Sequence, residues 1–186
     1  MSVVFSSDFS SIIRNKYVYL DCDILSAFYH DEIFLKEGLG LLSGSFLVID
    51  SFTEFEFLRD VYLPGQFEKK RAFLSYDIFS PATNHQELFS KIEMNAILLS
   101  RIYMHQNLHT KSSLTDLFLA ARLMYQKDPL LITGNKKHFP SCIFDTLGIV
   151  NVEQTTDVTV RAFCVVQFNE KKFSDCYENL QRILPI

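Results

Sequence analysis

The sequence contains no tryptophan, although 18 of its 186 residues are phenylalanine. It also contains no apolar run that approaches the roughly 18 residues needed for a membrane-spanning helix. The first residues, MSVVFSSDFSSIIRNK, lack the basic start and the continuous apolar core of a signal peptide. We draw no function from the aromatic balance. The other two absences lead us to expect a cytoplasmic protein with no membrane partner.

Cysteines are few, and their positions do not follow a metal-binding spacing. The four are Cys22, Cys142, Cys164 and Cys176. In a cytoplasmic protein such thiols are reduced and mostly buried. We therefore expect neither a disulfide framework nor a zinc site.

Basic residues are not in excess: 18 of them stand against 22 acidic residues, for a net charge of −4. This balance argues against a protein that coats nucleic acid nonspecifically. It leaves room for a local basic rim around an acidic centre. Two small basic clusters, 69–71 and 136–138, are more typical of solvated surface than of a binding patch.

Apolar residues make up 48% of the chain, enough for the core of one globular domain. We find no internal repeat, low-complexity tract or linker, so 1–186 is assigned to a single domain. Short apolar segments alternate with helical ones, which predicts an α/β fold with parallel strands. The predicted strands are 17–20, 45–50, 130–133, 149–152, 158–168 and a short one within 77–81. The predicted helices are 24–30, 34–42 with a break at its two glycines, 53–63, 66–76, 84–106, 113–128 and 170–184.

The chemically most informative stretch is 17–27, YVYLDCDILSA. Four apolar, β-prone residues predict a short buried strand, and Asp21 and Asp23 follow it directly. Open α/β sheets bind ligands at the C-terminal ends of their strands. A carboxylate buried there is costly unless it is paired or bound to a cation, so Asp21 is a candidate metal ligand. Asp23 is either a second ligand or the N-cap of the next helix.

Two further acids, Glu56 and Asp116, stand near predicted helix starts. Each has an ordinary structural alternative. Glu56 matches a capping box with Thr53. Asp116 lies in the first turn of a helix capped by Ser112 or Ser113, where the helix dipole favours an acid whatever the function.

Thr133 and Asn135 stand at the end of the strand 130–133. In a parallel sheet, the C-termini of strands and the N-termini of the helices that follow them share one edge. We therefore expect Asp21, Glu56, Thr133 and Asn135 to lie together, with an ordinary turn residue as the alternative for Asn135. This reasoning does not place Asp116 at the same edge.

Oxygen ligands without cysteine or histidine favour the hard cations Mg²⁺ and Mn²⁺. Such an ion activates water for attack on a phosphodiester and neutralises charge that develops on the phosphate oxygens. Two ions about 3.5–4 Å apart can share this work. Converging carboxylates repel one another, so their pKa values should rise in the metal-free protein. The residues are compatible with one ion or two.

Three stretches resemble the PIN-domain nucleases, and within them the VapC-type toxins of toxin–antitoxin pairs. YVYLDCDILSAF is similar to the family's strand, Asp, X, Asn, hydrophobic pair. FTEFEFLRD is similar to its Thr-X-X-Glu segment, which selects Glu56 rather than Glu54. SLTDLFLAARLMYQKDPLLITGNKKHF is similar to its Asp-X-X-hydrophobic-Ala-Ala helix followed by a strand and Thr-X-Asn-X-X-His-Phe. The match covers about residues 16–140.

The resemblance implies a three-layer α/β/α sandwich with a mainly parallel central sheet. It implies a core of about residues 16–153 and leaves an extension, about 154–186, that adds a C-terminal strand and helix. We expect this extension to cover a sheet edge or to form an interface.

The resemblance also implies a site and an activity. Asp21, Glu56 and Asp116 would hold Mg²⁺ or Mn²⁺ for cleavage of single-stranded or structured RNA. Asp23 stands where the family usually has Asn; its added negative charge either brings a second metal closer, as a further ligand, or only alters a hydrogen bond. Asn135 would take a fourth polar position, with Thr133 adjusting the site through hydrogen bonds. A small antitoxin protein and a homodimer are the partners this predicts.

Two alternatives remain open. A strand followed by Asp-X-Asp also resembles the haloacid-dehalogenase-type phosphatases, with Asp21 as nucleophile and Asp23 as general acid. That family needs a pair of acids after a late strand, where this sequence offers only Asp145. The second alternative is a PIN-like module without catalytic activity that binds RNA or a protein.

Overall fold

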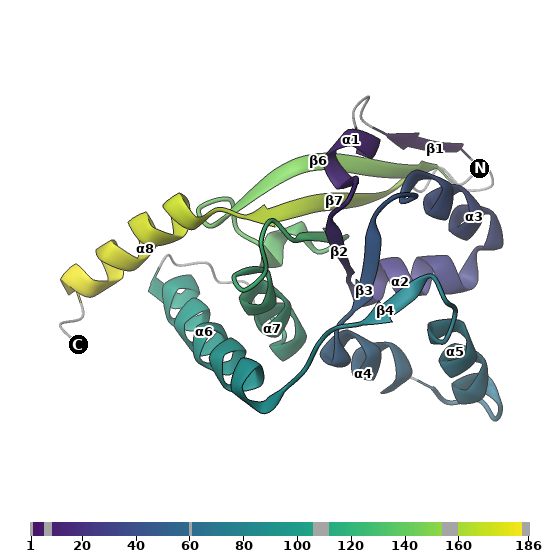
Figure 1. Ribbon diagram of the computed structural model, residues 1–186, viewed down its shortest axis with the longest axis horizontal. Helices are drawn as coiled ribbons and strands as arrows, with labels where there is room; N and C mark the ends of the chain where they lie inside the picture. The colour runs from purple at the N-terminus through teal and green to yellow at the C-terminus, as the bar shows by residue number, and fades with distance from the viewer. Residues whose placement is uncertain (1, 6–8, 60, 106–111, 154–159, 184–186) are drawn as a thin grey trace.

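The computed structural model describes residues 2–5, 9–59, 61–105, 112–153 and 160–183. Within these residues, seven strands form one sheet in the order β1-β6-β7-β5-β2-β3-β4, with helices around it (Figure 1). The strands are β1 (Ser2–Phe5), β2 (Tyr17–Leu20), β3 (Phe46–Ile49), β4 (Phe79–Pro81), β5 (Leu130–Thr133), β6 (Phe144–Glu153) and β7 (Val160–Phe168). The helices are α1 (Phe9–Ile13), α2 (Cys22–His30), α3 (Glu32–Leu41), α4 (Ser51–Arg59), α5 (Gln66–Leu74), α6 (Gln86–His105), α7 (Leu114–Leu123), the 3₁₀ turn η1 (Lys136–His138) and α8 (Glu170–Ile183). The α/β class is therefore confirmed.

The sheet is mixed rather than uniformly parallel. β5, β2, β3 and β4 run parallel to one another. β7, β6 and β1 continue the sheet through antiparallel pairs. Along the parallel part, the chain moves from β2 outward to β3 and β4 and then returns to β5 on the other side of β2. The order of connection therefore reverses between β2 and β5, and such a switch point is where open α/β sheets form ligand sites.

Side chains alternate between the two faces of the sheet and build two cores. Val18 and Leu20 pack on the face covered by α2, α3 and α5. Tyr19, between them in sequence, packs on the opposite face with α6, α7 and α8. Phenylalanine rings supply much of both layers, for example Phe57 against Phe73 and Phe139 against Phe144. Two buried faces explain why the inner parallel strands β2, β3 and β5 are almost wholly apolar.

The C-terminal extension lies inside the sheet, so the expectation that it covers an edge is wrong for its strand. β7 pairs with β5 along one side and with β6 along the other. α8 adds Cys176 and Leu180 to the second core. The predicted start of this strand at 158, the rest of 154–159 and residue 184 lie outside the described residues, as does Gln106 at the predicted end of α6.

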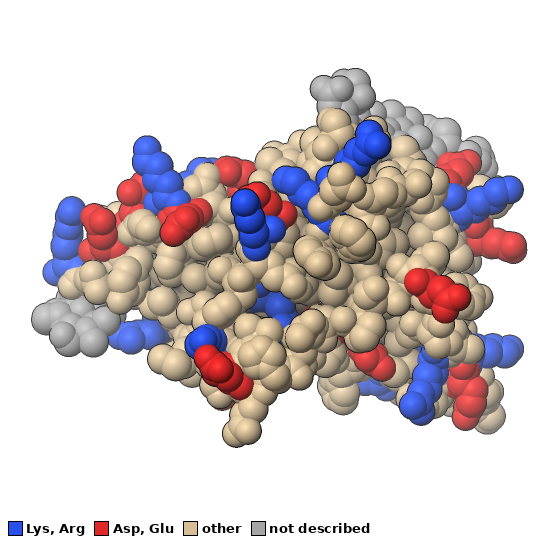
Figure 2. All heavy atoms as spheres, viewed as in Figure 1, with Lys and Arg blue, Asp and Glu red and all other residues tan. Residues whose placement is uncertain are grey.

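The described helices include none that is both long and apolar enough to cross a lipid bilayer. On the face shown in Figure 2, acidic and basic residues are interspersed and no basic patch forms. This distribution agrees with the small net charge of −4.

The predicted break at the two glycines of 34–42 is wrong, because α3 continues through both of them. Gly38 is buried, and a Cβ atom there would lie 2.6 Å from Cε1 of Phe28. Gly40 is exposed, and a Cβ atom there would meet nothing within 4 Å. Gly38 therefore allows α3 to approach α2, whereas Gly40 has no packing role.

The two glycines provide a matched test of this packing. Gly38→Ala should lower the free energy of unfolding by about 1–3 kcal/mol, because the methyl group overpacks against a buried ring. Gly40→Ala should raise it by about 0.5–1 kcal/mol, because alanine favours the helix. Urea denaturation of both variants measures the difference. Equal effects of the two substitutions would contradict the close approach at Gly38.

Candidate functional site

Asp21 joins the two central parallel strands at their C-terminal ends. Its backbone N–H donates to the carbonyl of Ile132 at 3.1 Å. Its Oδ1 accepts from the N–H of Cys22 at 2.7 Å, which caps α2, and its Oδ2 accepts from Oγ1 of Thr133 at 2.6 Å. Asp21 and Thr133 are both buried. The carboxylate thus lies at the switch point between β2 and β5.

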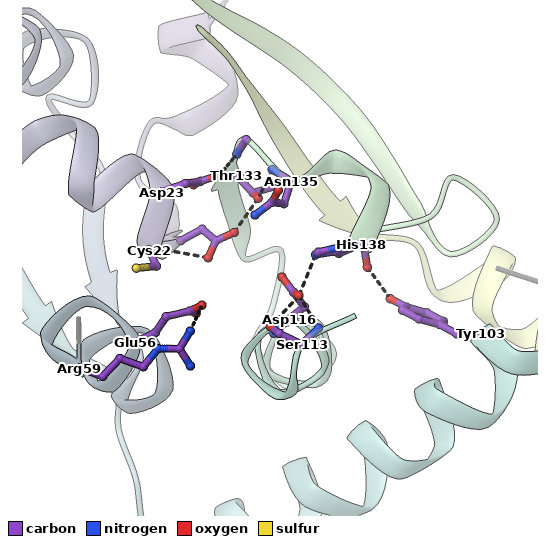
Figure 3. Close-up of polar contacts among 12 residues, drawn as sticks. Cys22, Asp23, Glu56, Arg59, Tyr103, Ser113, Asp116, Thr133, Asn135 and His138 are labelled. Atoms are coloured by element: carbon purple, nitrogen blue, oxygen red, sulfur yellow. Dashed lines mark hydrogen bonds and ion pairs between the residues drawn. The ribbon is translucent and has the colours of Figure 1, made fainter. Parts of the chain in front are cut away.

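Asp23 points back to the same place from the first turn of α2 (Figure 3). Its Oδ2 accepts from the N–H of Gly134 at 2.7 Å. Its Oδ1 is buried and accepts no hydrogen bond of good geometry in the described part of the chain, although the N–H of Ile24 lies close enough to lower the pKa of this carboxyl. A buried carboxylate oxygen without a well-aligned donor is unfavourable unless a cation or water meets it.

Asp116 comes to this site from the N-terminus of α7. The predicted cap at Ser113 is confirmed: Ser113 Oγ accepts from the N–H of Asp116 at 3.1 Å, and Asp116 Oδ2 accepts from the N–H of Ser113 at 2.7 Å. His138 of η1 places its Nδ1 2.7 Å from the same Oδ2. Helix capping is therefore one role of Asp116, and the contact with His138 is a second.

The predicted capping box between Thr53 and Glu56 is wrong. α4 begins at Ser51, and Asp50 caps it: Asp50 Oδ1 accepts a hydrogen bond from the N–H of Phe52 at 3.0 Å. Thr53 is buried inside the helix. Glu56 is therefore not needed for capping, and it lies 3.6 Å from Arg59 on the same helix. In Figure 3 its carboxylate faces the space between α4, α7 and the end of β5.

Of the two remaining predicted residues, Thr133 is buried and Asn135 lies at the rim. Thr133 Oγ1, besides donating to Asp21, accepts from the N–H of Asn135 at 2.9 Å. Asn135 is exposed. Lys136, which follows it, donates from Nζ to the carbonyl of Phe139 at 3.0 Å. This lysine is therefore engaged with the backbone rather than directed at the acids.

The acids influence one another electrostatically. The pKa of Asp21 is raised to about 7, first by burial and then by the charge of Asp23, against the hydrogen bonds from Thr133 and Cys22. The pKa of Asp23 is raised to about 6, mainly by burial, with Asp116 and Glu56 adding to the rise. Asp21, Asp23, Asp116 and Glu56 therefore form one acidic cluster, in which the ionisation of Asp21 and Asp23 is disfavoured.

Sequence reasoning missed a buried ion pair beside this cluster. Arg122 of α7 contacts Asp50 Oδ2 at 2.7 Å, and both side chains are almost fully buried. The guanidinium also donates to the carbonyl of Thr83 at 3.0 Å and to Asn84 Oδ1. The pair ties α7, which carries Asp116, to the start of α4, which carries Glu56. Its signal was a charged residue within the apolar face LAARL, since a buried arginine requires a partner.

The oxygen ligands of the cluster are of the type that hard cations prefer, but their present arrangement does not surround a metal site. In the described residues, no group of three or more His, Cys, Asp or Glu side chains is arranged so that it could hold a metal ion as it stands. The donor set is nevertheless oxygen-only, and Asp23 Oδ1 is a buried acceptor without a well-aligned donor. Binding of Mg²⁺ or Mn²⁺ would require Asp116 or Glu56 to turn further inward.

Comparisons of the chain with protein-family models, curated proteins and solved structures return no match.

The raised pKa values predict how stability depends on pH. Between about pH 4 and 7 the folded chain keeps protons on Asp21 and Asp23 that the unfolded chain has lost. The free energy of unfolding of metal-free protein should therefore fall as the pH rises through this window, by roughly 2–4 kcal/mol in all. Thermal melting in the presence of a chelator at pH 5 and pH 8 measures the fall.

Asp21→Asn should reduce this pH dependence and melt higher than the unsubstituted protein at pH 8. Asp77→Asn, which changes an exposed carboxyl outside the cluster, is the control and should leave the dependence unchanged. A pH dependence that is the same in the Asp21 variant would contradict the raised pKa of Asp21.

Proposed function

We propose that this chain is an Mg²⁺- or Mn²⁺-dependent endoribonuclease with a PIN-like fold. The observation that carries the proposal is the meeting of Asp21 and Asp23 with Asp116 at the switch point of the sheet. These residues come from β2–α2 and from α7, which are distant in sequence, and the charge of Asp116 adds to the rise that burial causes in the pKa values of Asp21 and Asp23. The strand order and the helices on both faces are compatible with a PIN-like arrangement.

In this proposal Asp21, Asp23, Asp116 and Glu56 hold the cation. A bound Mg²⁺ or Mn²⁺ activates water and neutralises charge on the phosphate oxygens. Thr133 and the N–H of Gly134 fix one oxygen each of Asp21 and Asp23. Asn135, exposed at the rim, is available to a substrate phosphate or sugar. The chain thus supplies the oriented carboxylate ligands, and the cation would act as the Lewis acid.

The assignment of RNA as substrate rests on the sequence resemblance to PIN-domain nucleases. We propose single-stranded or structured RNA as the substrate on this basis. A small antitoxin protein, a homodimer and a cytoplasmic location are proposed from the sequence as well. Neither the fold nor the charge distribution selects one RNA sequence. The role of toxin is therefore proposed as the biological setting of the nuclease activity.

Of the alternatives, the binding module is the second candidate, because no described group of acids is closed around a metal ion. The phosphatase reading has less support. Asp145, the lone acid that the sequence offers for the late acid pair of that family, pairs in register with Gln167, which in turn pairs with Leu130 at the start of β5. Asp145 is thus at the opposite edge of the sheet from Asp21, and it contacts Lys172 at 2.7 Å.

Cleavage of a labelled single-stranded RNA tests the proposal. The protein should cleave with Mg²⁺ or Mn²⁺ and stop with a chelator. Asp21→Asn and Asp116→Asn should each reduce the rate by about 100-fold or more, because each removes a charged ligand at nearly constant volume. Asp77→Asn, purified in the same way, controls for contaminating nuclease and should retain the full rate. Full activity in either site variant would refute the assignment.

A second test uses the close contact at Gly134. A Cβ atom there would lie 2.5 Å from Asp23 Oδ2, at the flexible end of that side chain, so Gly134→Ala should turn the carboxylate away without unfolding the protein. We expect the cleavage rate to fall by about 10- to 100-fold. Thermal melting should show a stability within about 1 kcal/mol of the original. Gly40→Ala is the matched control, and equal cleavage by the two variants would mean that Asp23 has no part in the site.

A further inference from the structure

The two carboxylate oxygens of Asp116 have different surroundings. The N–H and Oγ of Ser113 both donate to Oδ2 at 2.7 Å, and His138 Nδ1 lies 2.7 Å from the same atom. Within the described part of the chain, Oδ1 has no hydrogen bond. Asp116 itself is buried. One oxygen is therefore saturated, and the other is left for a different partner.

The capping of α7 does not explain the presence of His138. Ser113 and Asp116 already complete the capping box with reciprocal bonds. His138 comes from a different element, η1, which follows β5. The helix would be equally well capped without it. Its contact with Asp116 therefore calls for another explanation.

His138 is itself held in place from two sides (Figure 3). Its backbone N–H donates to the carbonyl of Asn135 at 2.9 Å. Its carbonyl accepts from the hydroxyl of Tyr103, on α6, at 3.1 Å. Nδ1 is buried, and although it is close to Asp116 it makes no hydrogen bond of good geometry there. A small rotation of the ring or of the carboxylate would align the two groups.

We propose that His138 is a positioning residue that holds Asp116 Oδ2, so that Oδ1 is the oxygen offered to the cation. This inference rests on the proposed function. The negative charges of Asp21 and Asp23 repel the carboxylate of Asp116, and a donor behind Oδ2 opposes that repulsion. Partners of this kind behind a metal-ligating carboxylate typically change metal affinity by 10- to 100-fold.

The test measures the Mn²⁺ dissociation constant from the electron paramagnetic resonance signal of free Mn²⁺. Three substitutions separate the roles of the ring. His138→Ala removes the donor. His138→Asn places an amide N–H near the position of Nδ1, and His138→Gln places it farther out, near Nε2. Lys137→Ala, at the exposed neighbouring position, is the control.

We expect the dissociation constant to rise about 10-fold or more in His138→Ala and in His138→Gln. It should stay within about threefold of the original in His138→Asn and in Lys137→Ala. If His138 had only a structural role, the Asn and Gln variants would have similar dissociation constants, because both side chains are polar and neither is much larger than imidazole. Melting of the metal-free variants shows whether each one is folded.

If His138→Ala destabilises the fold, Tyr103→Phe provides the second variant. It removes only the hydroxyl that holds the carbonyl of His138, and it should raise the dissociation constant by a smaller factor. If the Ala, Asn and Gln variants of His138 all bind Mn²⁺ as tightly as the wild-type protein, the inference is overturned and the proposed function still stands. Absence of Mn²⁺ binding by the wild-type protein would overturn both.

Discussion

The central constraint on this fold is the burial of carboxylates at the ends of neighbouring parallel strands. Asp21 lies between β2 and β5 with both oxygens bonded, and Asp23 and Asp116 add charge nearby. Several buried charges of one sign are unfavourable unless a counter-charge is present. A sheet optimised only for stability would have apolar or neutral residues there. This acidic cluster inside a well-packed α/β core therefore indicates that a cation binds there.

The surrounding structure restrains the cluster instead of neutralising it. Thr133 and Gly134 each donate to one carboxylate oxygen. Arg122, the buried cation nearby, contacts Asp50, so it holds α7 against α4 and does not cancel the charge of Asp21. Asp21 and Asp23 keep raised pKa values, first because they are buried and then because other acids lie close to them. This is the electrostatic condition expected of an unliganded metal site.

Local sequence signals predicted short elements and one helix cap better than they predicted the order of the sheet. The strand at Tyr17–Leu20 with Asp21 after it, and the cap at Ser113, follow from short-range pattern and were confirmed. The predicted capping box at Thr53 is wrong because Asp50 caps α4 three residues earlier. The spacing of residues in one sequence does not decide between these two caps. The position of β7 inside the sheet and the ion pair of Arg122 depend on contacts far apart in the chain. Periodicity carries no information about such contacts, whereas the burial of charge in LAARL does.

The most direct measurement is X-ray diffraction at the manganese absorption edge from crystals of the protein soaked in Mn²⁺. The account predicts an anomalous peak at about 2.0–2.4 Å from oxygens of Asp21 or Asp23 and of Asp116, with these side chains turned toward it. The switch point between β2 and β5 would then be a metal site. No peak there at saturating Mn²⁺, or peaks only beside surface carboxylates, would contradict the account. The acids would then serve as helix caps and backbone acceptors alone.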